Sequence, residues 1–129
     1  MKRDIDFPKV EGVQVAVVRK EDGWYVYLIN KNTFIIENVL VTSRGYGIVE
    51  QERRETSVLR HRLGNVVSEA SILIEPIDPQ VFILNNEYWV SYYIGNQIFD
   101  KKFIFIQGSI IEENFTSIPE LQLKGVLHV

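Results

Sequence analysis

Apolar residues along this chain recur mostly at every second position, which is the period of a β-strand with one buried face. In the segment GVQVAVVRK, for example, Val13, Val15 and Val17 would share one face of a strand. Such stretches are rich in Val, Ile, Tyr and Phe, which favour strands. Glycine or proline residues separate them. About seven segments are predicted to be strands: 12–20, 24–30, 36–43, 56–63, 68–76, 87–94 and 97–106.

Short connections between about seven strands are typical of a β-sandwich or a barrel. The pattern therefore predicts a single all-β domain. We expect an N-terminal arm (1–11), a sandwich domain (12–107) and a C-terminal extension (108–129). The extension is too apolar for a free tail, so it should dock on its own domain or on a partner.

The segment IVEQERRETSVLRHRL, residues 48 to 63, fits two structures. Glu50 and Arg54 are spaced for a helical ion pair. As a strand, the second half places Leu59, His61 and Leu63 on one face. We favour a polar turn near residues 50–54 followed by a strand, with a short helix as the alternative. Just before it, the glycines of GYG (45–47) predict a turn.

A hairpin is predicted in NNEYWVSYYIGNQIF, because Gly95-Asn96 suits a two-residue turn. The register pairs Tyr92 with Phe99, Tyr88 with Phe103, Tyr93 with Ile98, and Trp89 with Lys102. The face that carries Tyr88 should form the core. It would also bring Lys101 inward, a conflict that a bulge at residues 100–102 would relieve.

The opposite face of this hairpin would expose large side chains, which usually marks an interface. These candidate interface or ligand-platform residues are Trp89, Tyr93, Ile98, Lys102 and Ile104. Three explanations of what covers this face remain open. We favour a symmetric homodimer to which the C-terminal segment contributes. The alternatives are intramolecular cover by residues 110–129 and a platform for a ligand.

Composition sets limits on function. The 129 residues carry a formal net charge of −3, and 46% of them are hydrophobic, which is ordinary for a globular domain. The charge makes nucleic acid an improbable partner. The longest apolar run, Trp24 to Ile29, is too short for a membrane span. The N-terminus has no apolar signal region, and the chain lacks cysteine, so we expect a cytoplasmic protein without disulfides.

Two resemblances follow from these motifs. ILNNEYWVSYYI resembles the penultimate strand of immunoglobulin-like sandwiches, with Tyr88 placed as the corner tyrosine that bonds to the upstream backbone. The chain departs from that pattern, since it has no cysteine pair and Trp24 begins its strand. From the strand pattern and the resemblance of ILNNEYWVSYYI, we nevertheless expect an immunoglobulin-like antiparallel β-sandwich.

The second resemblance covers residues 12–107. VYLIN, NVLVTSRGYG, LRHRLG, IEPI and NNEYWVSYYIG…DKKFIF are similar to an uncharacterised family of small bacterial all-β proteins, some of which are labelled phenylalanine–tRNA synthetase. A class II synthetase core is far longer than this chain, and no arginine-bearing motif occurs here in a matching context. The resemblance implies a fold and no activity.

Candidate catalytic groups are few. His61 lies between two apolar positions of its strand face and is expected to be a packing histidine. The carboxylates considered for hydrolysis are Glu75, Asp78, Glu87 and Asp100, with Glu75 and Asp78 in a connection around Pro76. No pair stands out among them. Neither a metal-site spacing nor a nucleotide-binding motif occurs, so we expect no metal and no cofactor.

A cluster of arginines remains, namely Arg44, Arg53, Arg54, Arg60 and Arg62. Guanidinium groups suit anions. Three glutamates interleave with them, which favours a salt-bridged face over an anion patch. The sequence therefore predicts a non-enzymatic interaction or structural module that self-associates through an aromatic sheet face. The alternatives are a module that binds a sugar or base through Trp and Tyr, and a small hydrolase that uses carboxylates.

Overall fold

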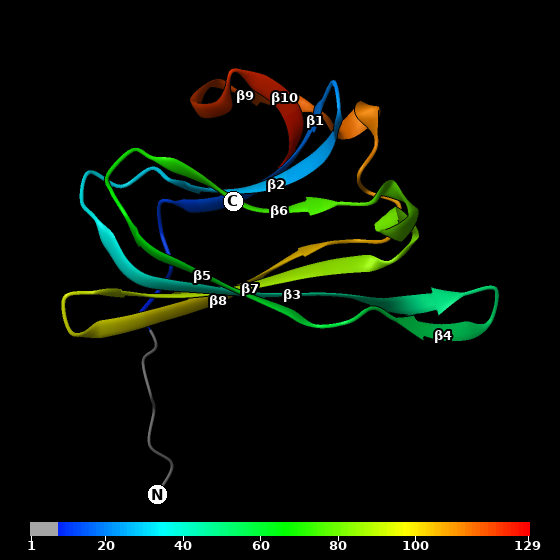
Figure 1. Cartoon of the computed structure of the whole chain (residues 1–129), viewed down its shortest axis with the longest axis horizontal. Helices are drawn as coiled ribbons and strands as arrows, with labels where there is room; N and C mark the ends of the chain where they lie inside the picture. The colour runs from blue at the N-terminus through cyan, green and yellow to red at the C-terminus, as the bar shows by residue number, and fades with distance from the viewer. Residues whose placement is uncertain (1–7) are drawn as a thin grey trace, which may run out of the picture.

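The computed structural model describes residues 8–129, which form two antiparallel β-sheets packed face to face (Figure 1). Sheet A has the order β6-β2-β1-β10-β9 and contains β1 (Val13–Lys20), β2 (Gly23–Asn30), β6 (Ser71–Ile77), β9 (Thr116–Ile118) and β10 (Leu123–His128). Sheet B has the order β4-β3-β7-β8, with β5 also paired to β3, and contains β3 (Ile36–Val49), β4 (Glu52–Glu55), β5 (Leu59–Val66), β7 (Asn85–Ile94) and β8 (Gln97–Phe105). The 3-10 helices η1 (Pro79–Ile83), η2 (Glu112–Asn114) and η3 (Pro119–Leu121) lie in connections. The all-β class is confirmed, with ten strands in the described residues where the pattern indicated about seven.

Strand β3 pairs with β7 along one side and with both β4 and β5 along the other. Gly45 and Gly47 lie inside it, so the turn predicted at GYG is wrong. The strand ends at a two-residue turn, where Glu50 and Gln51 have φ of 51° and 68°. β4 and β5 follow this turn. The expectation of a turn followed by a strand is therefore confirmed in part, because the turn occupies only residues 50 and 51 and residues 52–54 already belong to β4. The helical alternative is wrong.

The β7–β8 hairpin turns at Gly95 and Asn96 as predicted. All four predicted pairs occur: Tyr92 with Phe99, Tyr88 with Phe103, Tyr93 with Ile98, and Trp89 with Lys102. Gly95 has φ of 60°, a conformation that glycine adopts without steric cost.

The bulge predicted at residues 100–102 does not occur, because pairing continues without a shift from Ile94 to Asn86. Lys101 instead directs its charge out of the core. Its Nζ donates to the carbonyl oxygen of Val129 at 2.9 Å and lies 4.8 Å from the ring centroid of Phe103.

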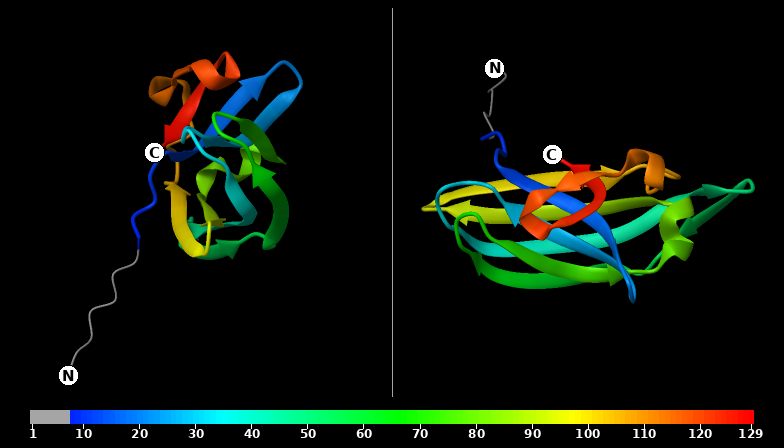
Figure 2. Two further views of the ribbon diagram at one scale, coloured as in Figure 1. Left: turned by 90° about the vertical axis from the view of Figure 1, so that its left-hand side faces the viewer. Right: turned by 90° about the horizontal axis from the view of Figure 1, so that it is seen from above.

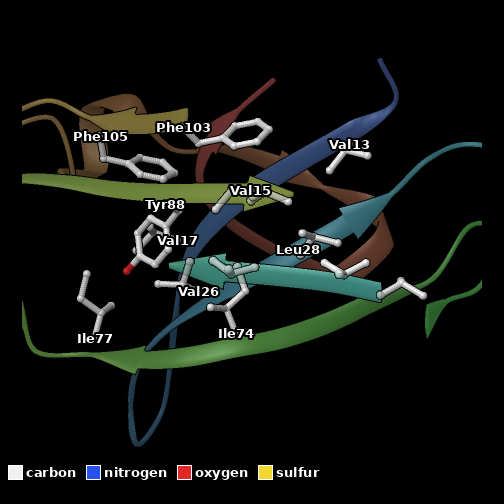
Figure 3. Close-up of a cluster of buried hydrophobic side chains, with 14 of the residues drawn as sticks. Val13, Val15, Val17, Val26, Leu28, Ile74, Ile77, Tyr88, Phe103 and Phe105 are labelled. Atoms are coloured by element: carbon white, nitrogen blue, oxygen red, sulfur yellow. The ribbon is translucent and has the colours of Figure 1, made fainter. Parts of the chain in front are cut away.

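The core fills the space between the inner faces of the two sheets (Figure 3). Tyr88 and Tyr92 are each 1% exposed, so the prediction that this face of β7 is buried is confirmed. Val15 and Val17 of β1 belong to the same cluster. Burying an aliphatic side chain of this size contributes about 1.5–3 kcal/mol, so this interior holds the sheets together.

The C-terminal residues complete sheet A. β10 pairs with β1, and glycine is needed at position 125 because a Cβ there would collide with the carbonyl oxygen of Val17. β9 and η3 then fold back over the outer face of sheet A (Figure 2), where Ile118 packs with Ala16 and Ile29 in a second buried cluster. Segment 108–129 thus docks on its own domain, and the sandwich extends beyond the boundary drawn at residue 107.

Residues 1–7 of the expected N-terminal arm lie outside the described residues. Residues 8–11 of the arm lead into β1 without forming a strand of their own. Among residues 8–129, no helix is long and apolar enough to cross a membrane.

Candidate functional site

The outer face of sheet B exposes aromatic and aliphatic side chains. Trp89, Tyr93 and Ile98 are 43%, 38% and 49% exposed. The pairing register places residues of β3 and β5 beside them on the same face. We call this surface the Trp89 face, and it consists of Leu40, Thr42, Arg60, Arg62, Trp89, Ser91, Tyr93, Ile98, Asp100, Lys102 and Ile104. The structure therefore brings all five candidate interface residues together.

The C-terminal segment does not cover the Trp89 face. Its strands β9 and β10 belong to sheet A and lie on the side of sheet A away from sheet B (Figure 2). Trp89 projects from the opposite outer face, because its neighbours Tyr88 and Val90 point into the core. Intramolecular cover by residues 110–129 is therefore wrong. The physical reason is that β1 offers β10 a free backbone edge, and pairing along that edge satisfies the main-chain groups of both strands.

A shallow groove crosses the Trp89 face. Its volume of about 240 Å³ lies below the usual range for small-molecule sites. Its lining residues are Leu40, Thr42, Trp89, Ser91, Ile98 and Asp100. The ammonium of Lys102 lies 4.6 Å from the centroid of the Trp89 ring. This cation–π contact occupies one face of the indole, where a sugar or base would otherwise stack.

The candidate anion patch is divided. Nε of Arg44 donates to Glu87, whose side chain is 5% exposed, at 3.2 Å, and this hydrogen bond raises the pKa of Arg44. Arg53 pairs with Glu55 at 3.2 Å. The register places Arg54 on the opposite side of β4 from Arg53. Arg44 and Arg53 lie on the same outer side of sheet B as Arg60 and Arg62, but each of the first two pairs with a glutamate. The five arginines therefore do not form one continuous basic surface.

A second cluster lies inside the sandwich and centres on the carboxylate of Glu75. Oγ of Ser43 donates to Oε1 at 2.7 Å, and Nε2 of His61 lies 2.7 Å from the same oxygen. Oη of Tyr88 donates to Oε2 at 3.0 Å. The three partners come from β3, β5 and β7 of sheet B, whereas Glu75 belongs to β6 of sheet A. The cluster therefore joins the two sheets through one carboxylate.

The surroundings of the Tyr88 hydroxyl keep it protonated. Burial raises its pKa above the usual value, and the negative charge of Glu75 and the hydrogen bond to it add to this effect. Figure 3 shows the hydroxyl directed toward the Ile77 end of β6. The expected bond of a corner tyrosine to the upstream backbone is replaced by this bond to the Glu75 side chain.

Sequence reasoning placed Glu75 in a connection, but it lies in β6 and points inward. In the pairing of β2 with β6, Val26 lies opposite Glu75 and Tyr27 opposite Leu73, so Ile74 is an extra residue. This bulge reverses the alternation, and Glu75 therefore shares the core face of Val26. No sequence signal marked the bulge, although Pro76 beside it suits an irregular edge strand.

A crevice of about 310 Å³ opens beside this cluster, at the edge where β6 approaches β3 and β5. Glu75 and Asp78 both line it. Glu87 and Asp100 instead project from the outer face of sheet B. Of the four candidate carboxylates, only Glu75 and Asp78 therefore share a cavity.

The cluster does not have the geometry of a serine nucleophile activated by histidine. Ser43 and His61 both contact the same oxygen of Glu75, so the serine proton goes to the carboxylate and not to the imidazole. His61 is half-buried, as a packing histidine would be, but the sequence did not predict its polar partner. Residues 8–129 hold no group of three or more His, Cys, Asp or Glu side chains suited to a metal ion.

Comparisons of the chain with protein-family models, with curated proteins and with solved structures found no match.

Proposed function

We propose that this protein is a non-enzymatic interaction module that self-associates through the Trp89 face. The difference between the two outer faces of the sandwich carries this proposal. On sheet A, Ile118 and its neighbours cover the outer apolar residues. On sheet B, Trp89 and Ile98 stay open to solvent. Exposed apolar surface of this kind usually marks an interface in a soluble protein.

The size of the face indicates a weak association. Four strands about 4.8 Å apart, with roughly eight residues each rising about 3.3 Å, span roughly 500 Å². Two copies would bury roughly 1,000 Å² together, which lies below the usual range for stable specific complexes. We therefore expect a reversible dimer in the micromolar range.

Charge favours one orientation of the two copies. One row across sheet B runs Arg62, Leu40, Ser91 and Asp100, with opposite charges at its two ends. A two-fold axis parallel to the strands places Arg62 against Asp100 of the partner subunit, and the reverse. The adjoining row brings Arg60 toward Lys102 of the partner subunit, and this repulsion keeps the dimer weak.

Sedimentation velocity over a concentration series tests this proposal. The wild type should shift from monomer to dimer as it approaches high micromolar concentration, and Trp89→Ala should remain monomeric. Val67→Ser is the matched control, because Val67 is 58% exposed but lies outside the Trp89 face. A wild type that stays monomeric at high micromolar concentration would refute self-association.

A charge exchange tests the orientation. Arg62→Glu and Asp100→Arg should each weaken the dimer, and the double variant should recover at least part of the lost affinity. Single variants that leave the affinity unchanged would contradict the proposed axis.

We also propose that the sandwich is immunoglobulin-like. The order β6-β2-β1 corresponds to strands E-B-A, and the order β8-β7-β3 to strands G-F-C, of immunoglobulin domains. The addition of β10 beside β1 departs from that plan. The similarity to small bacterial all-β proteins is consistent with this class and adds no activity to it.

The rival function is a platform for a sugar or base on the Trp89 face. Lys102 already covers one side of the Trp89 ring, which favours protein contact over ring stacking. A glycan array and a nucleotide binding screen separate the two, since saturable binding that Trp89→Ala abolishes would favour the platform.

A further inference from the structure

The crevice beside Glu75 is lined by both polar and apolar residues. It shares no lining residue with the groove on the Trp89 face. Ser43, Glu75 and Tyr88 supply polar atoms from both sheets, and Leu59 and Ile77 are among the apolar residues around them. Its volume of about 310 Å³ lies at the lower end of the range for small-molecule sites.

The hydrogen atoms of this polar wall are nearly all committed elsewhere. The hydroxyls of Ser43 and Tyr88 each have one proton, and both donate it to Glu75. Nδ2 of Asn86 donates to the carbonyl oxygens of Val81 and Leu84, which uses both of its protons.

The hydroxyl proton of Thr56, at the rim, is also used within the protein, because it is donated to the carbonyl oxygen of Ser57. Of the side-chain hydroxyls that line the crevice, only that of Ser57 donates to no acceptor within residues 8–129. What the wall offers a ligand is therefore mostly oxygen lone pairs.

The charged groups around the crevice also favour a ligand that donates hydrogen bonds. Glu75 lies in the wall, with a side chain that is 11% exposed, and Asp78 lies beside η1. Arg44 also lines the crevice, but its side chain lies on the outer face of sheet B, where its Nε donates to Glu87. Lone pairs and carboxylates together attract a ligand that carries positive charge and several donors.

We infer that this crevice binds an organic cation, namely a primary ammonium group on a short aliphatic stem. The ammonium has three donors and no acceptor, which complements an acceptor-rich wall, and the stem fits the apolar residues beside it. The cation would contact Glu75 at its free lone pair and the oxygens of Ser43 and Tyr88. This inference does not depend on self-association, because the two surfaces are separate.

The test is a titration with n-butylammonium chloride, followed by two-dimensional amide NMR and calorimetry. Shifts should be saturable and should concentrate at Ser43, Thr56 and Asp78. Neutral 1-butanol, which has a similar stem, should bind at least ten-fold more weakly.

Two variants test how much each carboxylate contributes to cation binding. Glu75→Gln keeps the size and removes the charge, and should weaken binding at least ten-fold. Asp78→Asn keeps an oxygen that can accept from the Gln80 amide and should weaken binding by a smaller factor. Glu55→Gln is the control, since Glu55 lies outside the crevice, and it should bind as the wild type does.

Near-UV circular dichroism checks that each variant is folded. If Glu75→Gln does not fold, Asp78→Asn and the comparison with 1-butanol still test whether the crevice binds a cation. Three results would overturn the inference: no saturable shifts at tens of millimolar, equal binding of 1-butanol, or shifts that concentrate on the Trp89 face.

Discussion

The hydrogen bonds of Glu75 should make the effect of Tyr88→Phe depend on the residue at position 75. In the wild type, Tyr88→Phe removes one hydrogen bond to a carboxylate and keeps the ring that packs edge-on against Phe105, with centroids 6.2 Å apart. A hydrogen bond to a charged group contributes about 1.5–3 kcal/mol, so Tyr88→Phe should reduce the free energy of unfolding by that amount.

Glu75→Leu should be more damaging. It leaves the hydroxyls of Tyr88 and Ser43, which are 1% and 4% exposed, without their acceptor. A buried donor without a partner costs about 1–3 kcal/mol, so the two together cost about 2–6 kcal/mol. A domain is typically stable by only about 5–15 kcal/mol, and this variant would therefore be marginal.

In the Glu75→Leu background the sign should reverse. Tyr88→Phe then removes a stranded hydroxyl and should stabilise the protein by about 1–3 kcal/mol. Equilibrium urea unfolding, followed by tryptophan fluorescence, gives the four free energies of this double-mutant cycle. If Glu75→Leu does not fold, Glu75→Gln replaces it, and the penalty for Tyr88→Phe should then shrink. A penalty for Tyr88→Phe that is equal in both backgrounds would refute the coupling.

Further predictions concern pH, two backbone positions and the synthetase label. Burial raises the pKa of Tyr92 to about 12, so its contribution to stability should be constant below about pH 10 and fall by about 1.4 kcal/mol per pH unit from there to about pH 12, where only the unfolded chain loses the proton. The pKa of Tyr88 is raised as well, so Tyr92→Phe should remove about half of the slope that the two tyrosines cause in urea titrations. Gln51→Gly should raise the free energy of unfolding by about 0.5–1 kcal/mol, since φ of 68° is costly for a side chain. Gly125→Ala should lower it by about 2 kcal/mol or more, because the new Cβ meets the Val17 carbonyl. The purified protein should neither activate phenylalanine nor retain transfer RNA at physiological salt, and retention that weakens as salt rises would point to the arginines of residues 44–62.

Local pattern predicted the β7–β8 hairpin well. The Gly95-Asn96 turn fixes the register, and the register fixes which side chains share a face. The separation of Trp89 from Tyr88 therefore followed from sequence alone. The same reasoning failed at Lys101, because its charge leaves the core by reaching the carbonyl of Val129, a contact between distant parts of the chain.

Long-range pairing was beyond such reasoning. β10 joins β1 although more than a hundred residues separate them, and nothing in the C-terminal pattern identifies that edge. The glycines at 45 and 47 were misread for a related reason. Glycine indicates a turn in isolation, but here β3 continues through both positions because β7 pairs with it at Gly45 and β4 pairs with it at Gly47.

The Glu75 cluster was the part of the candidate site that sequence could least predict. His61, Glu75 and Tyr88 were each noted separately, as a packing histidine, a carboxylate and a corner tyrosine. Their convergence depends on a single extra residue in β6, which turns Glu75 inward. Alternation counted through that bulge places the carboxylate on the wrong face.

Stability alone does not account for a carboxylate at this position. Apolar residues of similar volume in place of a buried polar cluster are often as stable, because no group then needs a partner. The cycle described above would show this directly if the Glu75→Leu, Tyr88→Phe double variant is nearly as stable as the wild type. In that case the three hydrogen bonds serve chiefly to hold a charged group in place. Because Glu75 also lines an open crevice, the held charge faces a space that a cation can enter.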